Sequence, residues 1–447
     1  MTGNSSESRL PLVHAIVYSF GYFGVQLIAF SIGQIPQIYY IPEEGIALIA
    51  PVTILGAFFA GGYLFGLLNA LGRIVDGVVD PWVGNLSDHC RSRFGRRKPF
   101  LVVGAPLMGV FLVLFTLPPT SGPSLANIAY LAVIYPLFFV FFTIAITPYL
   151  AMIPEITRTP SDRLLVTTLQ AVFLVAGTFT GVVLINLIPD RISFTLGATA
   201  IAVLSALPFL LVAAFVHIPS ESEPSEIPPR PSTIRQIRSA LAFAPFRIYL
   251  ASQAAFWFGF KMVETSARYV AVHLLGHRGA YLYILGTALG VATLFGIGSY
   301  WLGKNIGKRR SMILMSILFV ALLPWVATIG KGPLASPVAS YMLFAALGIP
   351  LSLLLVVPNS LLADIIDRDR EQSGERREAL FFASQALLTK IAIAFSGATL
   401  NLLLPIGAAE GVYAVGELGV RMVGPVAAAS VLVGLLVFLR FPDIEKR

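Results

Sequence analysis

Long runs of apolar residues with few charges dominate this sequence and decide what it can fold into. One of them, Gly45 to Gly72, holds twenty-eight residues without a charge. A helix needs about 20 apolar residues to cross a bilayer. Hydrophobic residues make up 56% of the chain and charged residues 12%, whereas a typical soluble domain is about 25% charged. The sequence therefore predicts an integral membrane protein.

Charge-poor segments of this length can be placed twelve times along the chain. They lie at 10–42, 45–80, 99–119, 127–154, 164–189, 192–217, 248–275, 279–303, 311–330, 332–363, 379–404 and 416–440. The polar start of the chain leads into the first segment without a cleavage pattern, so we expect the first span to be retained. The single cysteine, Cys90, excludes an internal disulfide bond and a thiolate metal cluster. The fold must therefore depend on helix packing, and we expect no cofactor.

The basic residues predict which loops face the cytoplasm. Most of the 31 Lys and Arg residues fall in alternate loops, which the positive-inside rule assigns to the cytoplasm. We therefore expect a multi-pass protein of the plasma (inner) membrane with both termini cytoplasmic. Because the basic residues are split among loops and form no single stripe, they do not indicate nucleic-acid binding. The expected partners are the lipid bilayer and a small-molecule substrate, and we expect a monomer.

An acidic, Pro- and Ser-rich stretch divides the chain. We expect an N-terminal six-helix half at 1–217, a cytoplasmic linker at 218–246 and a C-terminal six-helix half at 247–447. The halves echo one another, because Pro148 and Pro358, each preceding a charged loop, lie 210 residues apart. Gly95-Arg96-Arg97 and Gly307-Lys308-Arg309 lie 212 apart. These offsets indicate a duplicated unit, an arrangement typical of secondary transporters with a central site.

Three charged residues stand close together in the second span. Asp76 and Asp80 are four residues apart, so both carboxylates lie on one face of a helix and can share an ion. Two carboxylates this close cannot both stay ionised in a dry site without a cation or proton. In the alternative interpretation, Asp76 pairs with Arg73 and Asp80 caps a helix end ahead of Pro81.

The stretch FGRRKPF follows the second span. Asp88, the turn at Gly95 and the side chains of Arg96 and Arg97 can latch two helix ends through charge-assisted hydrogen bonds that break when the halves move. We assign these residues, with Arg73, to gating. In the alternative, the cluster only sets the topology.

The seventh span carries charges that can form a ladder. Lys261 and Glu264 are three residues apart, and Glu264 and Arg268 are four apart. We expect this ladder to face a central cavity, because charges facing lipid are costly. It either binds substrate or forms a structural network. In the first span, Gln26 and Gln34 can bond to substrate hydroxyls or, alternatively, hold helices together.

The segments DGVVDPWVGNLSD, SRFGRRKPF and ADIIDRDREQSGERREALFF, the last followed by Lys390, resemble the glycoside-pentoside-hexuronide:cation symporters of the major facilitator superfamily. The resemblance implies the major facilitator fold within the expected all-α membrane architecture. It also implies a cation site at Asp76 and Asp80, completed by Thr143 of the fourth span. Lys390 matches a lysine that the family places at the cavity.

The resemblance is incomplete at particular positions. Melibiose-transporting members of the family carry an Asn before the second Asp, where this chain has Val79, so a proton becomes a close competitor of sodium. Two aspartates that grip sugar in those members correspond here to Phe23 and Ile146. The substrate cavity is therefore expected to be more apolar.

The residue patterns, together with what the resemblance implies, predict a cation-coupled secondary symporter of a small hydroxylated solute, a glycoside, working by alternating access with H⁺ or Na⁺. Sodium at Asp76 and Asp80 is the one metal expected. The alternatives are a lysolipid or amphiphile transporter of the same fold and a non-transporting sensor on a transporter scaffold. We expect no enzyme, since HExxH, GxSxG and P-loop patterns are missing from the sequence.

Overall fold

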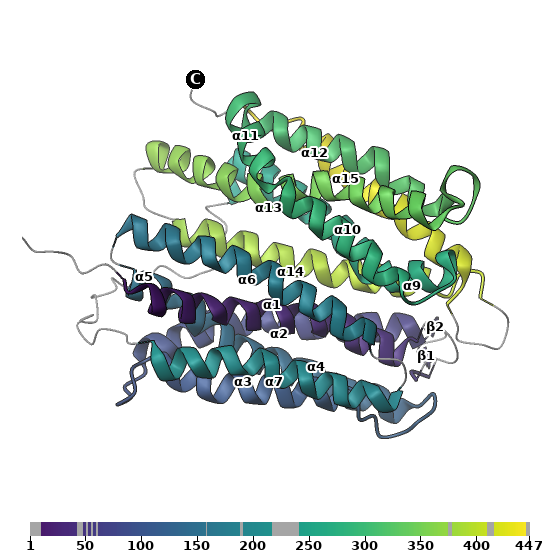
Figure 1. Cartoon of the computed structure of the whole chain (residues 1–447), viewed down its shortest axis with the longest axis horizontal. Helices are drawn as coiled ribbons and strands as arrows, with labels where there is room; N and C mark the ends of the chain where they lie inside the picture. The colour runs from purple at the N-terminus through teal and green to yellow at the C-terminus, as the bar shows by residue number, and fades with distance from the viewer. Residues whose placement is uncertain are drawn as a thin grey trace, which may run out of the picture. The chain divides into compact units, whose positions relative to one another are not determined.

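The computed structural model describes residues 10–42, 48–50, 52–54, 57–59, 61–157, 159–187, 191–216, 241–373, 378–408 and 415–443. Long helices make up almost all of the secondary structure in these ranges (Figure 1). The chain divides into two compact units: residues 1–40 with 71–227, and residues 41–70 with 228–447. We call them unit 1 and unit 2.

Unit 1 contains helices separated by short loops. They are α1 (Leu12–Tyr40), α3 (Lys98–Leu114), α4 (Leu125–Ala151), the short α5 (Ile153–Ile156), α6 (Pro160–Leu187) and α7 (Arg191–Phe215). Helix α2 (Gly61–His89) begins in unit 2 and continues into unit 1. It is preceded by two short antiparallel strands, β1 (Val52–Ile54) and β2 (Ala57–Phe59).

Unit 2 is built in the same way from the second part of the chain. Its helices are α9 (Ala244–Leu275), α10 (Ala280–Leu294), α11 (Gly296–Ile306), α12 (Lys308–Leu322), the 3₁₀ turns η1 (Leu323–Thr328) and η2 (Gly332–Leu334), α13 (Pro337–Ser373), α14 (Glu378–Leu403) and α15 (Glu417–Phe438).

The helices account for the twelve predicted spans. Eight helices in the described ranges are long and apolar enough to cross a membrane, and α3 and α10 are shorter apolar helices. Helices α2 and α9 have 29 and 32 residues, but they carry the charges of the candidate sites. The prediction of an all-α, twelve-span membrane protein is confirmed.

The second span was predicted at the wrong place. The helix starts at Gly61, not near residue 45, and it ends at His89, not near residue 80. Pro42 and Pro51, which resist helix formation, stand before the strands. At the other end, the helix continues through Pro81, as membrane helices can when neighbours satisfy the freed backbone groups. Helix α13 similarly extends to Ser373, beyond the predicted end at residue 363.

In unit 1, small residues and a tyrosine pair hold the helices together. A methyl group on Gly177 of α6 would lie 2.5 Å from the carbonyl oxygen of Phe23 on α1, so these helices approach as closely as their backbones allow. The hydroxyls of Tyr18 and Tyr149 each donate to the other residue's carbonyl oxygen at 2.8 Å. Their rings stack at 4.8 Å, which locks α1 to α4.

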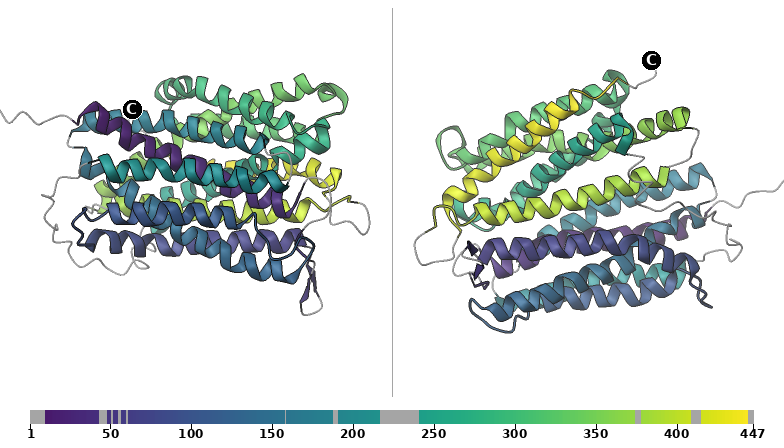
Figure 2. Two further views of the ribbon diagram at one scale, coloured as in Figure 1. Left: turned by 60° about the horizontal axis from the view of Figure 1, so that its bottom comes forward. Right: turned by 180° about the vertical axis from the view of Figure 1, so that it is seen from behind.

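Unit 2 repeats this design. Gly348 of α13 lies against α10, where a methyl group would meet the carbonyl oxygen of Ala288 at 2.5 Å. The hydroxyl of Tyr249 on α9 donates to the carbonyl oxygen of Pro358 on α13 at 3.0 Å. The helices of each unit run side by side (Figure 2). In both units a tyrosine of the first helix therefore bonds to the backbone at or next to the repeated proline, Pro148 or Pro358.

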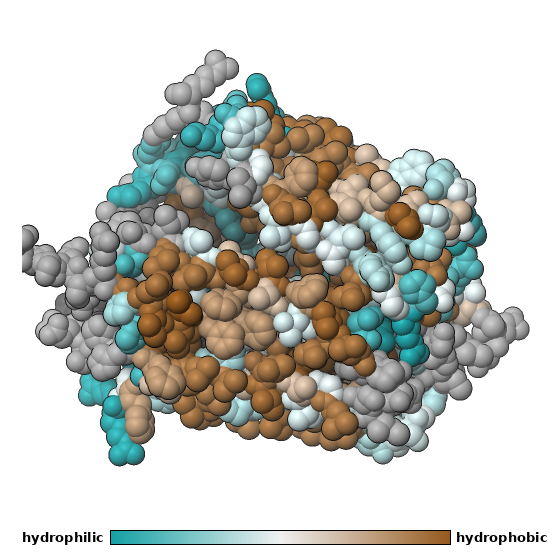
Figure 3. Space-filling model, in the orientation of Figure 1, coloured by the Kyte–Doolittle hydropathy of each residue, from teal (hydrophilic) through white to brown (hydrophobic). Residues whose placement is uncertain are grey.

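The surface of the protein is largely apolar, as expected for helices that contact lipid. Large apolar side chains such as Val78, Leu196, Leu294 and Met342 are more than half exposed. Figure 3 shows apolar residues spread over the sides of the helices, with hydrophilic residues gathered toward helix ends. A soluble protein rarely exposes apolar patches of this extent.

The predicted halves, 1–217 and 247–447, remain a prediction. Residues 217–240, most of the predicted linker, lie outside the described ranges. The units found by contact differ from the halves in two respects: residues 41–70 belong with unit 2, and the later boundary along the chain lies between residues 227 and 228.

Candidate functional site

Two carboxylates of α2 meet two hydroxyls of α4. The Thr143 hydroxyl donates to Asp76 Oδ1 at 2.7 Å. One turn further along both helices, the Thr147 hydroxyl donates to Asp80 Oδ1 at 2.8 Å. Both pairs are separated by 67 residues in the chain. The two helices therefore run in the same direction in constant register at this point.

Burial makes it costly for the carboxylates of this cluster to be ionised without a partner. Asp76 is 0% exposed and Thr143 1% exposed, whereas Asp80 is partly buried. An ionised carboxylate at membrane depth costs several kcal/mol unless it is neutralised or well hydrogen-bonded. Hydroxyl and carboxylate oxygens are ligands that hard cations prefer. The cluster can thus hold a proton or a small cation.

The extent of α2 tests the alternative interpretation, in which Asp80 caps a helix end and Asp76 pairs with Arg73. Because α2 continues to His89, Asp80 does not cap a helix end ahead of Pro81, and that part of the alternative is wrong. Arg73, one turn before Asp76, places its guanidinium 4.7 Å from the centre of the Phe139 ring on α4. Cation–π contact of this kind stabilises a desolvated guanidinium.

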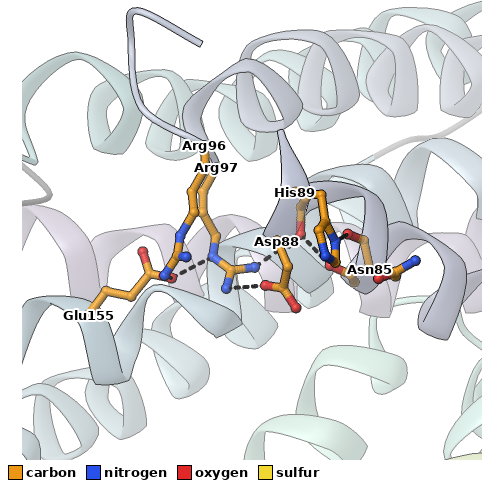
Figure 4. A network of polar contacts seen from close by, with 8 residues as sticks. Asn85, Asp88, His89, Arg96, Arg97 and Glu155 are labelled. Carbon is orange, nitrogen blue, oxygen red and sulfur yellow. Dashed lines mark hydrogen bonds and ion pairs between the residues drawn. The ribbon is translucent and has the colours of Figure 1, made fainter. Parts of the chain in front are cut away.

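The basic motif after α2 forms a compact network (Figure 4). Arg97 is 6% exposed, and its guanidinium donates to Ser87 at 3.0 Å, to Asp88 at 2.6 Å and to Glu155 at 2.8 Å. Arg96 donates to the same Glu155 oxygen at 2.7 Å. The network thereby ties the end of α2 and the start of α3 to α5.

One detail of this network differs from the sequence-based expectation. Asp88 lies in the last turn of α2 and not in the following loop. All partners belong to unit 1, so the bonds join helix ends within that unit. Gly95 has φ of 96°, a conformation that favours glycine and turns the chain back toward the acidic partners.

The matching motif of unit 2 makes a similar contact. Gly307 has φ of 91°, and the ammonium of Lys308 bonds to both oxygens of Asp364 on α13 at 2.7 and 2.6 Å. Arg309 donates to the carbonyl oxygens of Phe441 and Leu439 after α15. The repeat seen in the sequence therefore extends to the ion pairs.

The charges of α9 are partly brought together. The Lys261 ammonium lies 2.8 Å from both oxygens of Glu264. Their side chains are 24% and 12% exposed. Arg268, one turn further on, is 2% exposed. The first step of the predicted ladder is thus formed, inside unit 2.

The remaining predicted residues lie on separate helices. Gln26 is partly buried on α1 beside Gly177, and Gln34 of the same helix is 1% exposed. Lys390 lies on α14 and is partly exposed.

Three residues of these clusters were missed from the sequence. Thr147 could have been found, because it stands four residues after Thr143 and must share its helix face. Ser87 and Glu155 carry no comparable signal. Glu155 lies 58 residues from Arg97, and only the folded arrangement of α4 and α5 brings it there.

Two units of membrane-length helices, each with its own charged motif, together with the buried carboxylate cluster of unit 1, define a multi-pass secondary transporter of the major facilitator type. The fold is shared with a crystal structure of a mutant of the nucleoside transporter NupG, at a TM-score of 0.71 and 10% identity, covering 96% of this chain and 99% of that one. A profile of the family described as MFS/sugar transport protein matches residues 15–442. The chain belongs to this family.

Known proteins of two kinds are similar to this chain. The inner membrane symporter YicJ of Escherichia coli is 25% identical over 76% of this chain and 74% of its own. YagG of the same organism, proposed to be a glycoside/cation symporter, is 27% identical over 76% and 74%. The sodium-dependent lysophosphatidylcholine symporter 1-B of Danio rerio is 22% identical over 99% and 89%.

Proposed function

We propose that this protein is a cation-coupled symporter that moves a small hydroxylated solute, a glycoside, by alternating access. The observation that carries the proposal is the pair of contacts Asp76–Thr143 and Asp80–Thr147 on neighbouring helices. Acidic groups buried in a membrane protein mark ion pathways. Binding of a cation or proton removes the cost of their burial, which couples the ion to the conformational cycle.

The coupling ion is proposed to be H⁺ at least as readily as Na⁺. A proton needs only a carboxylate, whereas sodium needs several oxygen ligands. At residue 79 the chain carries Val, which offers no side-chain oxygen. Uptake that required sodium and ignored a pH gradient would overturn this preference.

The glycoside assignment is supported by the family and by the similarity to YagG. We propose that the substrate-binding residues are Gln26, Gln34, Lys261, Glu264, Arg268 and Lys390. Gating is assigned to Arg73, Asp88, Gly95, Arg96 and Arg97. The protein is proposed to be a monomer of the plasma membrane with both termini in the cytoplasm.

A second candidate substrate is a lysolipid. The similarity to the zebrafish lysophosphatidylcholine symporter extends over 99% of this chain. Phe23 and Ile146, at positions where the family's melibiose transporters carry aspartates, favour an apolar ligand. The glycoside remains the first candidate because the family is one of sugar transport proteins.

The first prediction concerns uptake by purified protein in proteoliposomes. With an inward H⁺ or Na⁺ gradient, we expect a glycoside from a labelled panel to accumulate, and lysophosphatidylcholine not to. Asp80→Asn should abolish accumulation against a gradient, because the variant cannot release and rebind the ion as a carboxylate does.

Asp367→Asn provides the matched control, since Asp367 is an exposed carboxylate of α13. It should transport normally. Undiminished uphill accumulation by Asp80→Asn would show that Asp80 is not part of the ion site. Uptake of lysophosphatidylcholine and of no glycoside would show that the substrate is a lysolipid.

A further inference from the structure

Like Thr143, Thr147 differs from Thr178 and Thr180 of α6 in the group to which its hydroxyl donates. Hydroxyls of membrane helices often bond back to the carbonyl four residues earlier. Thr178 and Thr180 of α6 do this, donating to Leu174 and Ala176 at 2.9 and 2.8 Å. The Thr147 hydroxyl instead donates to a carboxylate on another helix, Asp80, at 2.8 Å.

The position of Thr147 follows from the register of the two helices. Four residues separate it from Thr143, and four separate Asp80 from Asp76. Each aspartate therefore meets one threonine at the same height, and the cluster offers two carboxylates and two hydroxyls. Arg73 and Asp76 are the nearest charged residues on α2, and α4 carries no charged residue.

We propose that Thr147 is a member of the ion site and sets the affinity of Asp80 for the coupling ion. The inference rests on the proposed cation-coupled transport. Its hydroxyl donates to the ionised carboxylate, and it can also accept a weaker bond from a protonated one or offer a lone pair to a cation. Asp80 is more exposed than Asp76, so the Asp80–Thr147 pair exchanges the ion first and the buried Asp76–Thr143 pair holds it.

The second prediction uses Thr147→Val, which keeps the shape and removes the hydroxyl. A hydrogen bond to a charged group contributes enough to change an equilibrium about tenfold. If the ion is H⁺, the ionised carboxylate loses a donor, and half-maximal uptake should occur at about tenfold lower proton concentration. If the ion is Na⁺, a ligand is lost, and half-maximal uptake should need about tenfold more sodium. One variant therefore tests the site and identifies the ion.

Three other variants complete the experiment. Thr147→Ser keeps the hydroxyl and should match the unsubstituted protein, and Thr178→Val removes a back-bonded hydroxyl and should leave ion dependence unchanged. If Thr147→Val does not fold, as judged by its melting temperature, Thr147→Ala is measured in its place and the same shift is expected.

Unchanged ion dependence in a folded Thr147 variant, together with a shift in Thr143→Val, would overturn the inference and leave the proposed function intact. Normal uphill transport by Asp80→Asn would instead contradict the proposed function itself. The two failures are therefore distinguishable.

Discussion

At the scale of the residue, the α9 pair shows how a charge is tolerated in a membrane helix. The Lys261 ammonium meets both Glu264 oxygens, so each charge is neutralised on its own helix. Both side chains are mostly buried. Breaking a buried pair by removing one partner costs more than removing both, because a single buried charge is left uncompensated.

The third prediction follows from that difference. Glu264→Gln leaves Lys261 charged and should lower stability by about 3 kcal/mol, toward the lower end of the range for buried pairs because the pair is partly exposed. The double variant Lys261→Met/Glu264→Gln should be more stable than Glu264→Gln alone. Melting of the purified variants in detergent, alongside uptake, is the measurement. A double variant worse than the sum of both single variants would refute the pairing.

At the scale of the element, sequence patterns predicted the helices better than they predicted the contacts of the candidate sites. Apolar runs indicated twelve spans, because a bilayer fixes the length of a span. They misplaced α2, since the apolar stretch before Gly61 reads as helix by hydropathy while part of it forms strands. The i,i+4 spacing put Asp76 and Asp80 on one face, and the family resemblance added Thr143. The partner Glu155 was missed, because contacts between distant segments have no local sequence signal.

The fourth prediction concerns the turn between α11 and α12. Gly307 has φ of 91° and ψ of 150°, a backbone region that is essentially confined to glycine. Gly307→Ala should destabilise the protein by about 1–3 kcal/mol and weaken the Lys308–Asp364 pair that the turn positions. Differential scanning fluorimetry gives the measurement.

Gly290 supplies the matched control for this substitution. It lies inside α10, and a methyl group added there would meet no atom within 4 Å in the described structure. Gly290→Ala should stabilise by about 0.5–1 kcal/mol, because alanine favours the helix. Equal effects of the two substitutions would show that the Gly307 conformation is not required.

At the scale of the whole molecule, the chain is divided unevenly. Residues 41–70 come early in the sequence but belong to unit 2. There the Tyr269 hydroxyl of α9 donates to the Ile41 carbonyl oxygen at 2.5 Å. Gly66 of α2 lies against Ala398 of α14, where a methyl group would come within 2.7 Å. The first part of the chain thus supplies a piece of the second unit.

The fifth prediction tests whether residues 41–70 belong to unit 2. The chain is split within 218–246. Two co-expressed fragments should assemble and transport, because residues 41–70 of the first fragment pack into the unit formed by the second. Copurification through a tag on one fragment and uptake in vesicles are the measurements.

Tyr269→Phe removes the hydrogen bond to Ile41 in the segment 41–70 and should reduce copurification several-fold. Tyr341→Phe, on α13, is the control and should leave copurification unchanged. Fragments that fold but do not copurify would contradict the assignment of residues 41–70 to unit 2.

The constant separation of 67 residues between α2 and α4 has an evolutionary consequence. An insertion anywhere between the two helices changes the separation of both pairs by the same amount and leaves both contacts in place. A single deletion between Asp76 and Asp80 would turn one carboxylate by about 100° around the helix and abolish its pair. Homologues with longer connections between α2 and α4 can therefore keep the same two contacts. They can be recognised by two Asp–Thr pairs that have the same separation in the sequence, whatever that separation is.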